Sequence, residues 1–376
     1  GLVPESFETY QIVEPGDLII RCMDLQNDKT SLRTGLAKDH GIITSAYLNL
    51  KINENFDSKF LYYYLHSLDT TKVLYKFGTG LRQNLSFQDF NRLPIFDIPK
   101  ALQTTIVNFL DQKTAQIDEA ISIKEKQIKL LKERKQIIIQ QAVTQGLNPN
   151  VQMKASGVDW IAEIPEYWTI KKFRFSFDFG KGLNITKENL QDNGIPCVNY
   201  GEIHSKFGFE LNPEIHKLLC VSEEYLKKFP KSLLNEGDFV FADTSEDFDG
   251  AGNFTYFNSS EATFAGYHTV ITRPLINFNS RFIAYFFDSL AYRKQVRKRM
   301  KGVKVYSITQ SILKDTQLLL PSELEQDEVV RFLDTETNKI KNAIDIQESQ
   351  IKKLKEYKTT LINSAVTGKI KVPGVA

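Results

Sequence analysis

The sequence has few cysteines, no long apolar run and almost no net charge, and each shortage excludes a class of protein. Its three cysteines, Cys22, Cys197 and Cys220, form no CxxC pair, which argues against a disulfide framework or a zinc knuckle and favours a reducing compartment. No apolar run approaches the roughly 20 residues that a membrane span needs. The formal net charge is only +2, so any surface that binds nucleic acid must be local. We therefore expect a cytoplasmic protein with no membrane contact.

Motifs for nucleotide, metal and cofactor binding are missing as well. The sequence contains no GxxxxGK[ST], and Gly78-x-Gly80 lacks the third glycine of a dinucleotide-binding loop. The five histidines show no metal-ligand spacing. The acidic cluster of Asp243, Glu246, Asp247 and Asp249 fits a polar turn better than the metal site of a nuclease. We therefore expect no metal, no cofactor and no catalytic residue, which disfavours a self-sufficient nuclease.

The chain does contain a long helical pattern that occurs twice. Residues 109–144 and 332–367 align without a gap at an offset of 223, and 20 of the 36 positions are identical. Neither stretch contains Gly or Pro, so nothing in them interrupts a helix. An internal repeat this close indicates that the chain is built from two copies of one unit.

Both helical stretches carry an apolar seam with alternating spacings of four and three, which is the heptad pattern of a coiled coil. Polar residues interrupt the two seams at equivalent positions, for example at Lys124 and Gln347. Matching seams predict that the helices pack on each other rather than only on their own domains. The predicted packing residues are Ile117, Ile121, Ile128 and Leu131 in the first helix and Ile340, Ile344, Ile351 and Leu354 in the second.

The repeat extends beyond the helices into the regions before them. Gly16 and Asp17 match Gly237 and Asp238, each pair opening an apolar run that predicts a strand. An amphipathic helix is predicted after Asp57, and residues 93–99 read as an apolar strand. These patterns predict an α+β fold: two related domains of twisted sheet and small helices, separated by an antiparallel two-helix coiled-coil spacer.

The predicted organisation has five parts. These are a first domain at residues 1–101, a first spacer helix at 102–146, a linker and second domain at 147–321, a second spacer helix at 322–368, and a tail at 369–376. Gly157, where the second domain begins, lies 80 positions before Gly237, whereas only 15 residues precede Gly16. By this comparison the first domain lacks its front, and a complete copy would need roughly 65 more residues.

A basic run at residues 292–306 is the strongest candidate for contact with nucleic acid. It holds seven basic residues in 15 with a tyrosine at each end, and we expect no acidic residue to balance it. On a helix Arg293, Arg297 and Lys301 share one face, which favours phosphate contacts over the alternative of a solvated helix face. The predicted DNA-binding residues are Lys181, Arg293, Arg297, Lys301, Lys304 and Tyr306 in the second domain and Lys72, Lys76, Arg82, Gln83 and Asn84 in the first.

Two of these assignments have a strong structural alternative. Arg82 and Gln83 lie in a glycine-bracketed loop, where their side chains could serve as loop-capping hydrogen-bond donors instead. Lys181 belongs to a second basic group with Lys171, Lys172 and Arg174, for which the solvent face of a strand is an equal alternative.

Three stretches resemble the specificity subunit of type I restriction-modification enzymes. Residues 157–168, GVDWIAEIPEYW, are similar to the opening of a target-recognition domain in that family. Residues 80–86, GLRQNLS, look like a motif late in such domains, although the second copy has Lys304-Val305-Tyr306 in its place. Both long helices end in Ala-Val-Thr and look like the family's spacer regions.

The resemblance implies a non-catalytic subunit that reads double-stranded DNA. Each target-recognition domain would read one half of a bipartite site, and the paired helices would hold the domains apart. Two methyltransferase subunits and then translocating nuclease subunits would assemble on this scaffold, and these partners would supply the S-adenosylmethionine, ATP and magnesium chemistry.

Two other interpretations stay open. One is the specificity subunit of a related multisubunit restriction enzyme with fused cutting and methylating activities. The other is a truncated, inactive remnant that acts only as a partner-binding scaffold through its helices. The basic and aromatic positions of the second domain weigh against the remnant.

Overall fold

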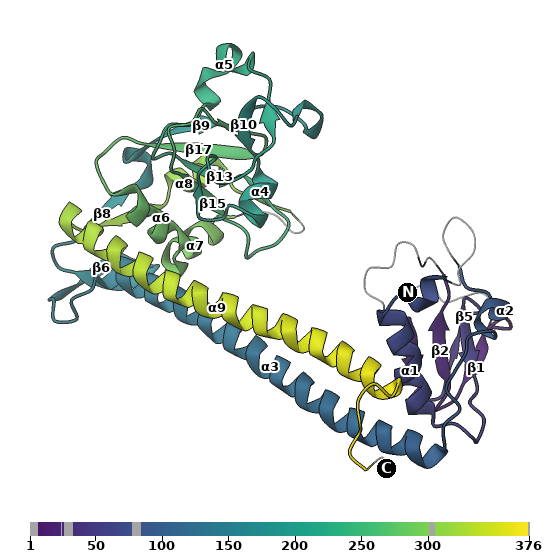
Figure 1. The fold of residues 1–376 in the computed structure, drawn as a ribbon. Coiled ribbons are helices and arrows are strands. Elements are labelled where there is room, and N and C mark those ends of the chain that lie inside the picture. Colours follow the sequence, from purple (N-terminus) through teal and green to yellow (C-terminus); the bar gives the residue numbers. More distant parts are fainter. Residues whose placement is uncertain (1–6, 24, 26–32, 77–83, 301–304, 375–376) are drawn as a thin grey trace. The chain divides into compact units, whose positions relative to one another are not determined.

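The computed structural model describes residues 7–374 except 24, 26–32, 77–83 and 301–304 (Figure 1). The chain divides into two compact units, and the boundary crosses both long helices. Unit 1 comprises residues 1–128 and 344–376, and unit 2 comprises residues 129–343. Each unit contains its own sheet, short helices and one end of each long helix, so the predicted α+β fold is confirmed.

Unit 1 is built on a three-stranded antiparallel sheet of order β3-β2-β5, with a separate pair β1-β4 (Figure 1). Helix α1 begins after Asp57, whose carboxylate accepts from the backbone N–H groups of Lys59 and Phe60, so the predicted cap and helix are confirmed. The strands are β1 Gln11–Val13, β2 Leu18–Arg21, β3 Thr34–Leu36, β4 Gly41–Ile43 and β5 Tyr47–Leu50; the short helices are α1 Ser58–Thr70, η1 Val73–Lys76 and α2 Phe87–Phe90.

Unit 2 has a larger five-stranded sheet of order β11-β15-β13-β17-β9 and a three-stranded sheet of order β12-β10-β16. Its strands are β6 Met153–Val158, β7 Ile161–Pro165, β8 Thr169–Lys172, β9 Phe177–Lys181, β10 Ile195–Val198, β11 Glu210–Leu211, β12 Cys220–Val221, β13 Phe239–Ala242, β14 Thr244–Ser245, β15 Phe254–Phe257, β16 Phe264–Ala265, β17 Thr269–Pro274, β18 Tyr306–Ser307 and β19 Gln317–Leu320. Its helices are η2 Phe173–Phe175, η3 Lys187–Asn189, α4 Tyr200–Ser205, α5 Tyr225–Lys228, η4 Pro230–Ser232, α6 Ser280–Asp288, α7 Leu290–Arg297 and α8 Gln310–Lys314.

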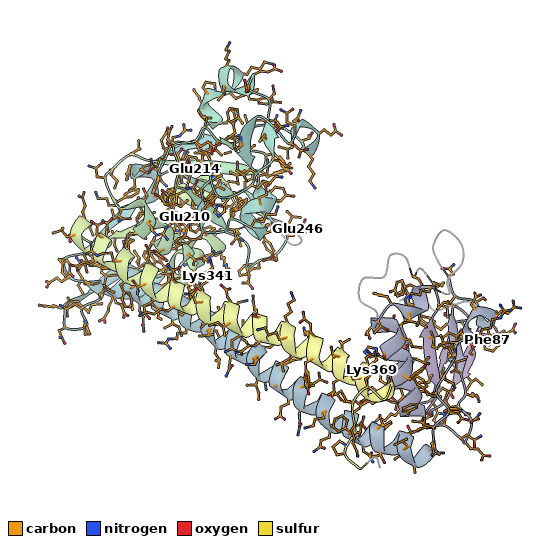
Figure 2. All side chains as sticks on the ribbon, in the orientation of Figure 1. Phe87, Glu210, Glu214, Glu246, Lys341 and Lys369 are labelled. Carbon is orange, nitrogen blue, oxygen red and sulfur yellow. The ribbon has the colours of Figure 1, made fainter. Side chains whose placement is uncertain are left out.

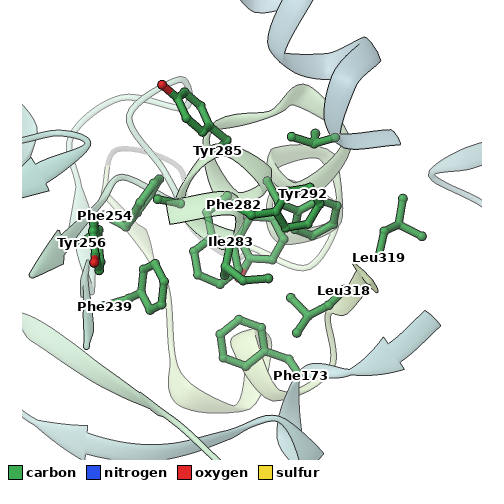
Figure 3. Packing of buried hydrophobic residues seen from close by; sticks show 14 of the residues in the cluster. Phe173, Phe239, Phe254, Tyr256, Phe282, Ile283, Tyr285, Tyr292, Leu318 and Leu319 are labelled. Carbon is green, nitrogen blue, oxygen red and sulfur yellow. The ribbon is translucent and has the colours of Figure 1, made fainter. Parts of the chain in front are cut away.

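Aromatic side chains dominate the core of unit 2 (Figure 3). Phe239 and Phe254 point from neighbouring strands toward Phe282 of α6 and Tyr292 of α7, and the ring of Phe239 lies 6.4 Å from that of Phe254. Burying rings of this size supplies much of the hydrophobic stabilisation of such a domain. The core fixes α7, and with it the start of the basic run, against the sheet.

The same turn opens the central strand of each unit. Gly16 and Gly237 have φ values of 96° and 92°, a conformation that glycine adopts without steric cost. In unit 1 the backbone N–H of Glu14 donates to Asp17 Oδ2 at 2.9 Å, and the equivalent bond from Asn235 to Asp238 in unit 2 is also 2.9 Å. The predicted turn into a strand is therefore confirmed, and it is present in both units.

The two long helices are α3 Lys100–Gln145 and α9 Glu323–Val366, which are the two helices that the repeat predicts. Within unit 1 the Lys358 ammonium contacts the Asp118 carboxylate at 2.7 Å, and Lys124 Nζ donates to Gln347 Oε1 at 3.1 Å. From the first of these contacts to the second, the residue number rises on α3 and falls on α9, so the two helices lie antiparallel. The eight seam residues Ile117, Ile121, Ile128, Leu131, Ile340, Ile344, Ile351 and Leu354 are all buried or half-buried.

Each unit buries the start of one long helix and the end of the other. In unit 1 the core includes Ile106 and Leu110 from the start of α3 together with Ile362 from the end of α9. In unit 2 the core includes the equivalent residues at an offset of 223, Val329 and Leu333 from α9 with Ile139 from α3. The duplication therefore covers the packing of each domain on both helices as well as the sequence.

A set of polar contacts, here called the joint, ties α1 to the start of α3 in unit 1. The backbone N–H of Asp57 donates to the buried Gln103 Oε1 at 2.8 Å. The Tyr63 hydroxyl donates to Asp111 Oδ1 at 2.8 Å, and Lys59 also pairs with Asp111. Burial raises the pKa of Tyr63 to about 12, so its hydroxyl stays a donor at neutral pH.

Unit 2 repeats the joint between α6 and the start of α9. The backbone N–H of Asn279 donates to the buried Gln326 Oε1 at 2.8 Å, and the Tyr285 hydroxyl donates to Asp334 Oδ1 at 2.6 Å. Arg281 Nε lies 2.8 Å from Asp334 Oδ1. All five residues stand 222 or 223 positions after their counterparts in unit 1.

The predicted strand at residues 93–99 is wrong, since the structure gives this segment no regular secondary structure. Pro94 and Pro99 stand near the two ends of this segment, and neither has a backbone N–H to donate to a neighbouring strand. In unit 2 the equivalent segment is β19, which pairs with β8. No strand pairs with residues 93–99 among the described residues of unit 1, and side chains bind the segment instead: Tyr64 donates to the carbonyl of Pro94 at 2.9 Å.

None of the described helices is both long enough and apolar enough to cross a membrane.

Candidate nucleic-acid interface

The basic run at residues 292–306 begins on α7, which starts where Ser289 caps it. The Ser289 hydroxyl accepts from the backbone N–H of Tyr292, and Tyr292 and Val296 are buried in the core. The helix ends at Arg297, so a continuous helical face from Arg293 through Lys301 is not formed in the described part of the run. Lys301 and Lys304 lie outside the described residues.

The expectation that no acidic residue balances this run is wrong. Arg293 pairs with Asp288 at 3.2 Å, and Arg297 pairs with Asp249 at 3.4 Å. A third pair joins Lys298 to Asp159 at 2.8 Å, although both of these side chains are largely exposed. Asp249 and Asp159 come from distant segments, so inspection of the run alone could not reveal them, whereas Asp288 lies five positions before Arg293.

Arg293 is held by the protein from both sides. Its side chain is only 13% exposed, and besides Asp288 it donates to Asn253 Oδ1 at 2.9 Å. Asn253 in turn donates to His204 Nδ1 at 2.9 Å, and His204 Nε2 lies 2.8 Å from the carbonyl oxygen of Thr244. This chain of hydrogen bonds fixes the loop at residues 243–253 between α4 and α7.

Arg297 and Tyr306, two of the predicted site residues, are brought together by Phe248. The Arg297 guanidinium lies 5.4 Å from the centre of the Phe248 ring, and that ring lies 5.7 Å from the ring of Tyr306. Arg297 also donates to the carbonyl of Asp249 at 2.6 Å. Burial and the neighbouring Arg293 lower the pKa of Arg297, yet a guanidinium remains charged at neutral pH.

The loop at residues 243–253 is a structured polar turn. Ser245 Oγ donates to the carbonyl of Asp247 at 2.7 Å, and Gly250 donates to the Asp247 carboxylate. The described residues contain no group of three or more His, Cys, Asp or Glu side chains able to hold a metal ion. Figure 2 shows Glu246 on this loop, on the side of unit 2 that carries α4 in Figure 1.

The strand pair β14-β18 links this loop to the end of the basic run. Thr244 pairs with Ser307 and Ser245 with Tyr306, both in antiparallel register. The loop, the end of α7 and Tyr306 therefore form one continuous surface of unit 2, although the loop lies about 50 positions before the other two in the chain. This surface is the candidate nucleic-acid interface.

Lys181 and its neighbouring basic group are on other elements. Lys181 is exposed at the end of β9, where its carbonyl accepts from Ser232 at 2.9 Å. Lys171 and Lys172 are exposed on β8, and Arg174 pairs with Asp315.

The predicted site residues of unit 1 are only partly described. Lys72 has a φ of 61°, and its ammonium lies 2.8 Å from the Tyr75 hydroxyl and 4.4 Å from the centre of the Tyr75 ring. Lys76 is exposed at the end of η1, and Asn84 is exposed beyond the undescribed loop. Arg82 and Gln83 lie outside the described residues.

The family model for the type I restriction modification DNA specificity domain matches residues 165–356. That range is just over half of the chain and includes α7, the loop at residues 243–253, β18 and most of α9.

The chain belongs to the type I restriction-modification DNA specificity family.

Known members agree with this assignment. The chain is 24% identical over 336 residues to the type I restriction enzyme MjaVIII specificity subunit of Methanocaldococcus jannaschii, covering 88% of this chain and 75% of that protein. The fold matches a chain from a structural study of complex assembly and conformational transition in the type I R-M system, with a TM-score of 0.74, 16% identity and coverage of 97% and 85%. It also matches the HsdS subunit from Thermoanaerobacter tengcongensis, with a TM-score of 0.51, 16% identity and coverage of 96% and 82%. The resemblance seen in the sequence is confirmed, and this specificity subunit recognises DNA sequence.

Proposed function

We propose that this chain is the non-catalytic, DNA-reading subunit of a type I restriction-modification complex. Each of its two domains reads one half of a bipartite target, and α3 and α9 set the gap and dock methyltransferase subunits. The observation that carries the proposal is the duplicated arrangement: two related domains, each joined by the same polar contacts to one of two antiparallel helices. Double-stranded DNA, two methyltransferase subunits and translocating nuclease subunits are the proposed partners.

The length of the helices supports a spacer role. Helix α3 has 46 residues, which at 1.5 Å per residue gives about 69 Å. One turn of DNA spans about 34–36 Å, so a helix of this length exceeds the distance between half-sites one turn apart. Pseudo-twofold repeats suit such bipartite targets, and the different sequences of the two domains favour two different half-sites.

Within unit 2 we assign different roles to the members of the basic run. The exposed Lys294 and Lys298 contact phosphates, together with Lys301 and Lys304. Arg297 and Tyr306 face the DNA from the Phe248 cluster. Arg293 acts indirectly, since its contacts to Asn253 and Asp288 position the loop at residues 243–253.

For unit 1 we assign phosphate contacts to the exposed Lys72 and Lys76, and base or backbone contacts to Arg82, Gln83 and Asn84 around the following loop. Lys181 is assigned to phosphate contact at the edge of unit 2. Substitution of these lysines by Ala tests the assignments. Each substitution of a lysine that contacts a phosphate should lower the salt slope of DNA binding by about one.

The central test is coexpression with a methyltransferase subunit of the same system, followed by methylome sequencing. We expect adenine methylation at a bipartite, asymmetric sequence, and no methylation by the purified chain alone. Methylation by the chain alone contradicts the non-catalytic role. A complex that forms but methylates no defined sequence supports instead a scaffold that only binds partners.

A matched insertion tests the spacer role. One extra heptad after Lys124 and another after Gln347, residues that hydrogen-bond at 3.1 Å, lengthen both helices by about 10 Å. The gap should then grow by about three base pairs at 3.4 Å each, while both half-sites stay unchanged. A single insertion after Lys124 alone serves as the control, because it breaks the pairing register without a matching partner. An unchanged gap in the double insertion contradicts the spacer role.

A further inference from the structure

Three partly exposed rings meet at one end of the main sheet of unit 2. Tyr200 stands at the start of α4, and Tyr267 and His268 immediately precede β17. The Tyr200 ring lies 5.7 Å from that of Tyr267 and 5.2 Å from that of His268, and Tyr267 and His268 are 6.0 Å apart. All three contacts are edge-to-face, which is a favourable geometry for ring pairs. We call these three residues the ring cluster.

The turn that carries the ring cluster is tightly fixed. The backbone N–H of Gly266 donates to the carbonyl of Val198 at 2.7 Å, and Thr269 Oγ1 donates to the carbonyl of Gly266 at 2.7 Å. A Cβ atom at Gly266 would lie 1.9 Å from Asn199 Oδ1, which itself accepts from the backbone N–H of Tyr267 at 3.2 Å. No residue with a side chain can replace Gly266 without displacing this contact.

His268 is held in a backbone conformation that histidine rarely adopts. Its φ is 56°, in the left-handed region, although its side chain is 56% exposed and fills no core position. Strained residues persist where their surroundings over-determine them, and they concentrate at functional sites. Core packing does not account for this conformation, which presents the imidazole at the surface.

Asp243 orients the His268 imidazole. Asp243 Oδ1 lies 3.2 Å from His268 Nδ1 and also accepts from Thr244 Oγ1 at 2.7 Å. A carboxylate beside Nδ1 favours the tautomer with the proton on that nitrogen, which leaves Nε2 as a hydrogen-bond acceptor. Asp243 is itself 34% exposed, so two acceptors face solvent beside the rings.

The ring cluster is continuous with the candidate nucleic-acid interface. The backbone N–H of Asp243 donates to the carbonyl of His268 at 3.0 Å, and the Asp243 carbonyl accepts from the backbone N–H of Ile308 at 2.8 Å. The next residue, Thr244, pairs with Ser307, and Tyr306 follows in the same strand pair. One end of β13 therefore carries the ring cluster on one side and the end of the basic run on the other.

We propose that Asp243 and His268, supported by Tyr200 and Tyr267, read one base of the half-site bound by unit 2. This inference rests on the proposed function. In the major groove cytosine N4 and adenine N6 are the exocyclic amino donors, whereas guanine O6 and thymine O4 are acceptors. Because Asp243 and Nε2 of His268 are both acceptors, the pair selects a base with an amino group, cytosine or adenine. The basic run supplies phosphate contacts that fix the register.

The test uses the full chain in complex with its methyltransferase subunits and duplexes that carry each of the four base pairs at every position of the half-site. Asp243→Asn replaces one acceptor by an amide that also donates. It should lower methylation of the original target by about tenfold to a hundredfold and relax or reverse the preference at one position only. Glu224→Gln, at the exposed residue that precedes α5 and pairs with Lys228, is the matched control and should leave the specificity unchanged.

His268→Gly separates reading from folding. Glycine adopts a φ near 56° without strain, so this variant should fold at least as well as the original chain while it loses discrimination at the same position. Retention of the original preference by both variants overturns the inference, and so does an equal loss on all sequences, which indicates a role that does not depend on the base. If the unaltered complex methylates no defined sequence, the proposed function fails and this inference fails with it.

Discussion

The joints of unit 1 and unit 2 differ in the cation that meets the helix carboxylate. Lys59 contacts Asp111, whereas Arg281 binds Asp334 at 2.8 Å and also Glu210 at 2.7 Å. An ammonium is a compact charge, but a guanidinium presents donors in a fixed fork. Arginine at this position can therefore connect three elements where lysine connects two.

The additional carboxylate is on a strand of unit 2. Glu210 lies on β11, which extends the sheet of unit 2 beyond β15. In the described residues of unit 1 the corresponding sheet has the order β3-β2-β5, and no strand takes the place of β11. The duplicated contacts to the backbone are the same in both units, while the side-chain network of unit 2 also includes Glu210 of β11.

The two joints should differ most in the stability that each unit loses when its helix carboxylate is removed. Asp334→Ala removes the acceptor of Tyr285 and one of the two carboxylates that bind Arg281, and it should lower the free energy of unfolding of unit 2 by about 3 kcal/mol. Asp111→Ala should cost about 1 kcal/mol, because Lys59 is half exposed and regains water. Chemical denaturation with hydrogen exchange of α6 and α1 measures both effects, and equal losses contradict the comparison.

The two buried glutamines should behave alike. Gln326→Ala and Gln103→Ala each leave a partly buried backbone N–H without its side-chain acceptor, at Asn279 and Asp57, and each should cost about 2 kcal/mol. Hydrogen exchange at the first turns of α6 and α1 reports the loss. Gln112→Ala, at an exposed position of α3, is the control. A large difference between the two glutamine variants argues that the joints are not equivalent.

Exchanging the two cations tests whether the several fixed donors of the guanidinium matter at this position. Arg281→Lys should cost unit 2 about 1 kcal/mol, since an ammonium cannot keep the contacts to both Asp334 and Glu210. The reverse change, Lys59→Arg, should stabilise unit 1 by less than about 0.5 kcal/mol, because the described residues of unit 1 place no second carboxylate beside this side chain. Thermal unfolding compares the two, and a large gain from Lys59→Arg contradicts this explanation.

A small pH dependence of the stability of unit 2 is also expected. Burial by itself would raise the pKa of Glu210, but hydrogen bonds from Arg281 and Asn258 outweigh it and lower the pKa below the usual 4.5. A lowered carboxyl pKa stabilises the folded state above 4.5, and this contribution disappears as the pH falls through the folded-state pKa. Glu210→Gln should remove this dependence, by less than about 1 kcal/mol. Unfolding curves at pH 7 and pH 3 for the variant and the original chain measure it, and an unchanged difference contradicts the assignment.

Local chemistry explains which parts of the fold were predictable. Gly16 and Gly237 open their strands because a left-handed turn needs glycine, and Asp57 caps α1 through its own side chain. Such features depend on a few neighbouring residues. Residues 93–99 were mispredicted because a strand also needs a partner, and an apolar stretch does not specify one.

The candidate interface was less predictable, because its charges are balanced across the fold. The basic run suggested free cations, yet Asp159 and Asp249 approach it from two distant segments, and Asp288 pairs with Arg293 from the end of the preceding helix. Nothing near Arg293 in the sequence points to Asn253 or His204. The ring cluster was equally hidden, since Tyr200 and His268 are separated by 68 positions.

Covalent order alone was enough to establish two repeated units, two long helices and the family, because periodic seams, caps and glycine turns act over short distances and recur at a constant offset. The tertiary structure decided which cations are neutralised, which strands find partners and which rings meet beside Asp243. Those outcomes depend on distances between segments far apart in the chain, and hydrogen bonds and ion pairs form only when folding brings their atoms within a few ångströms.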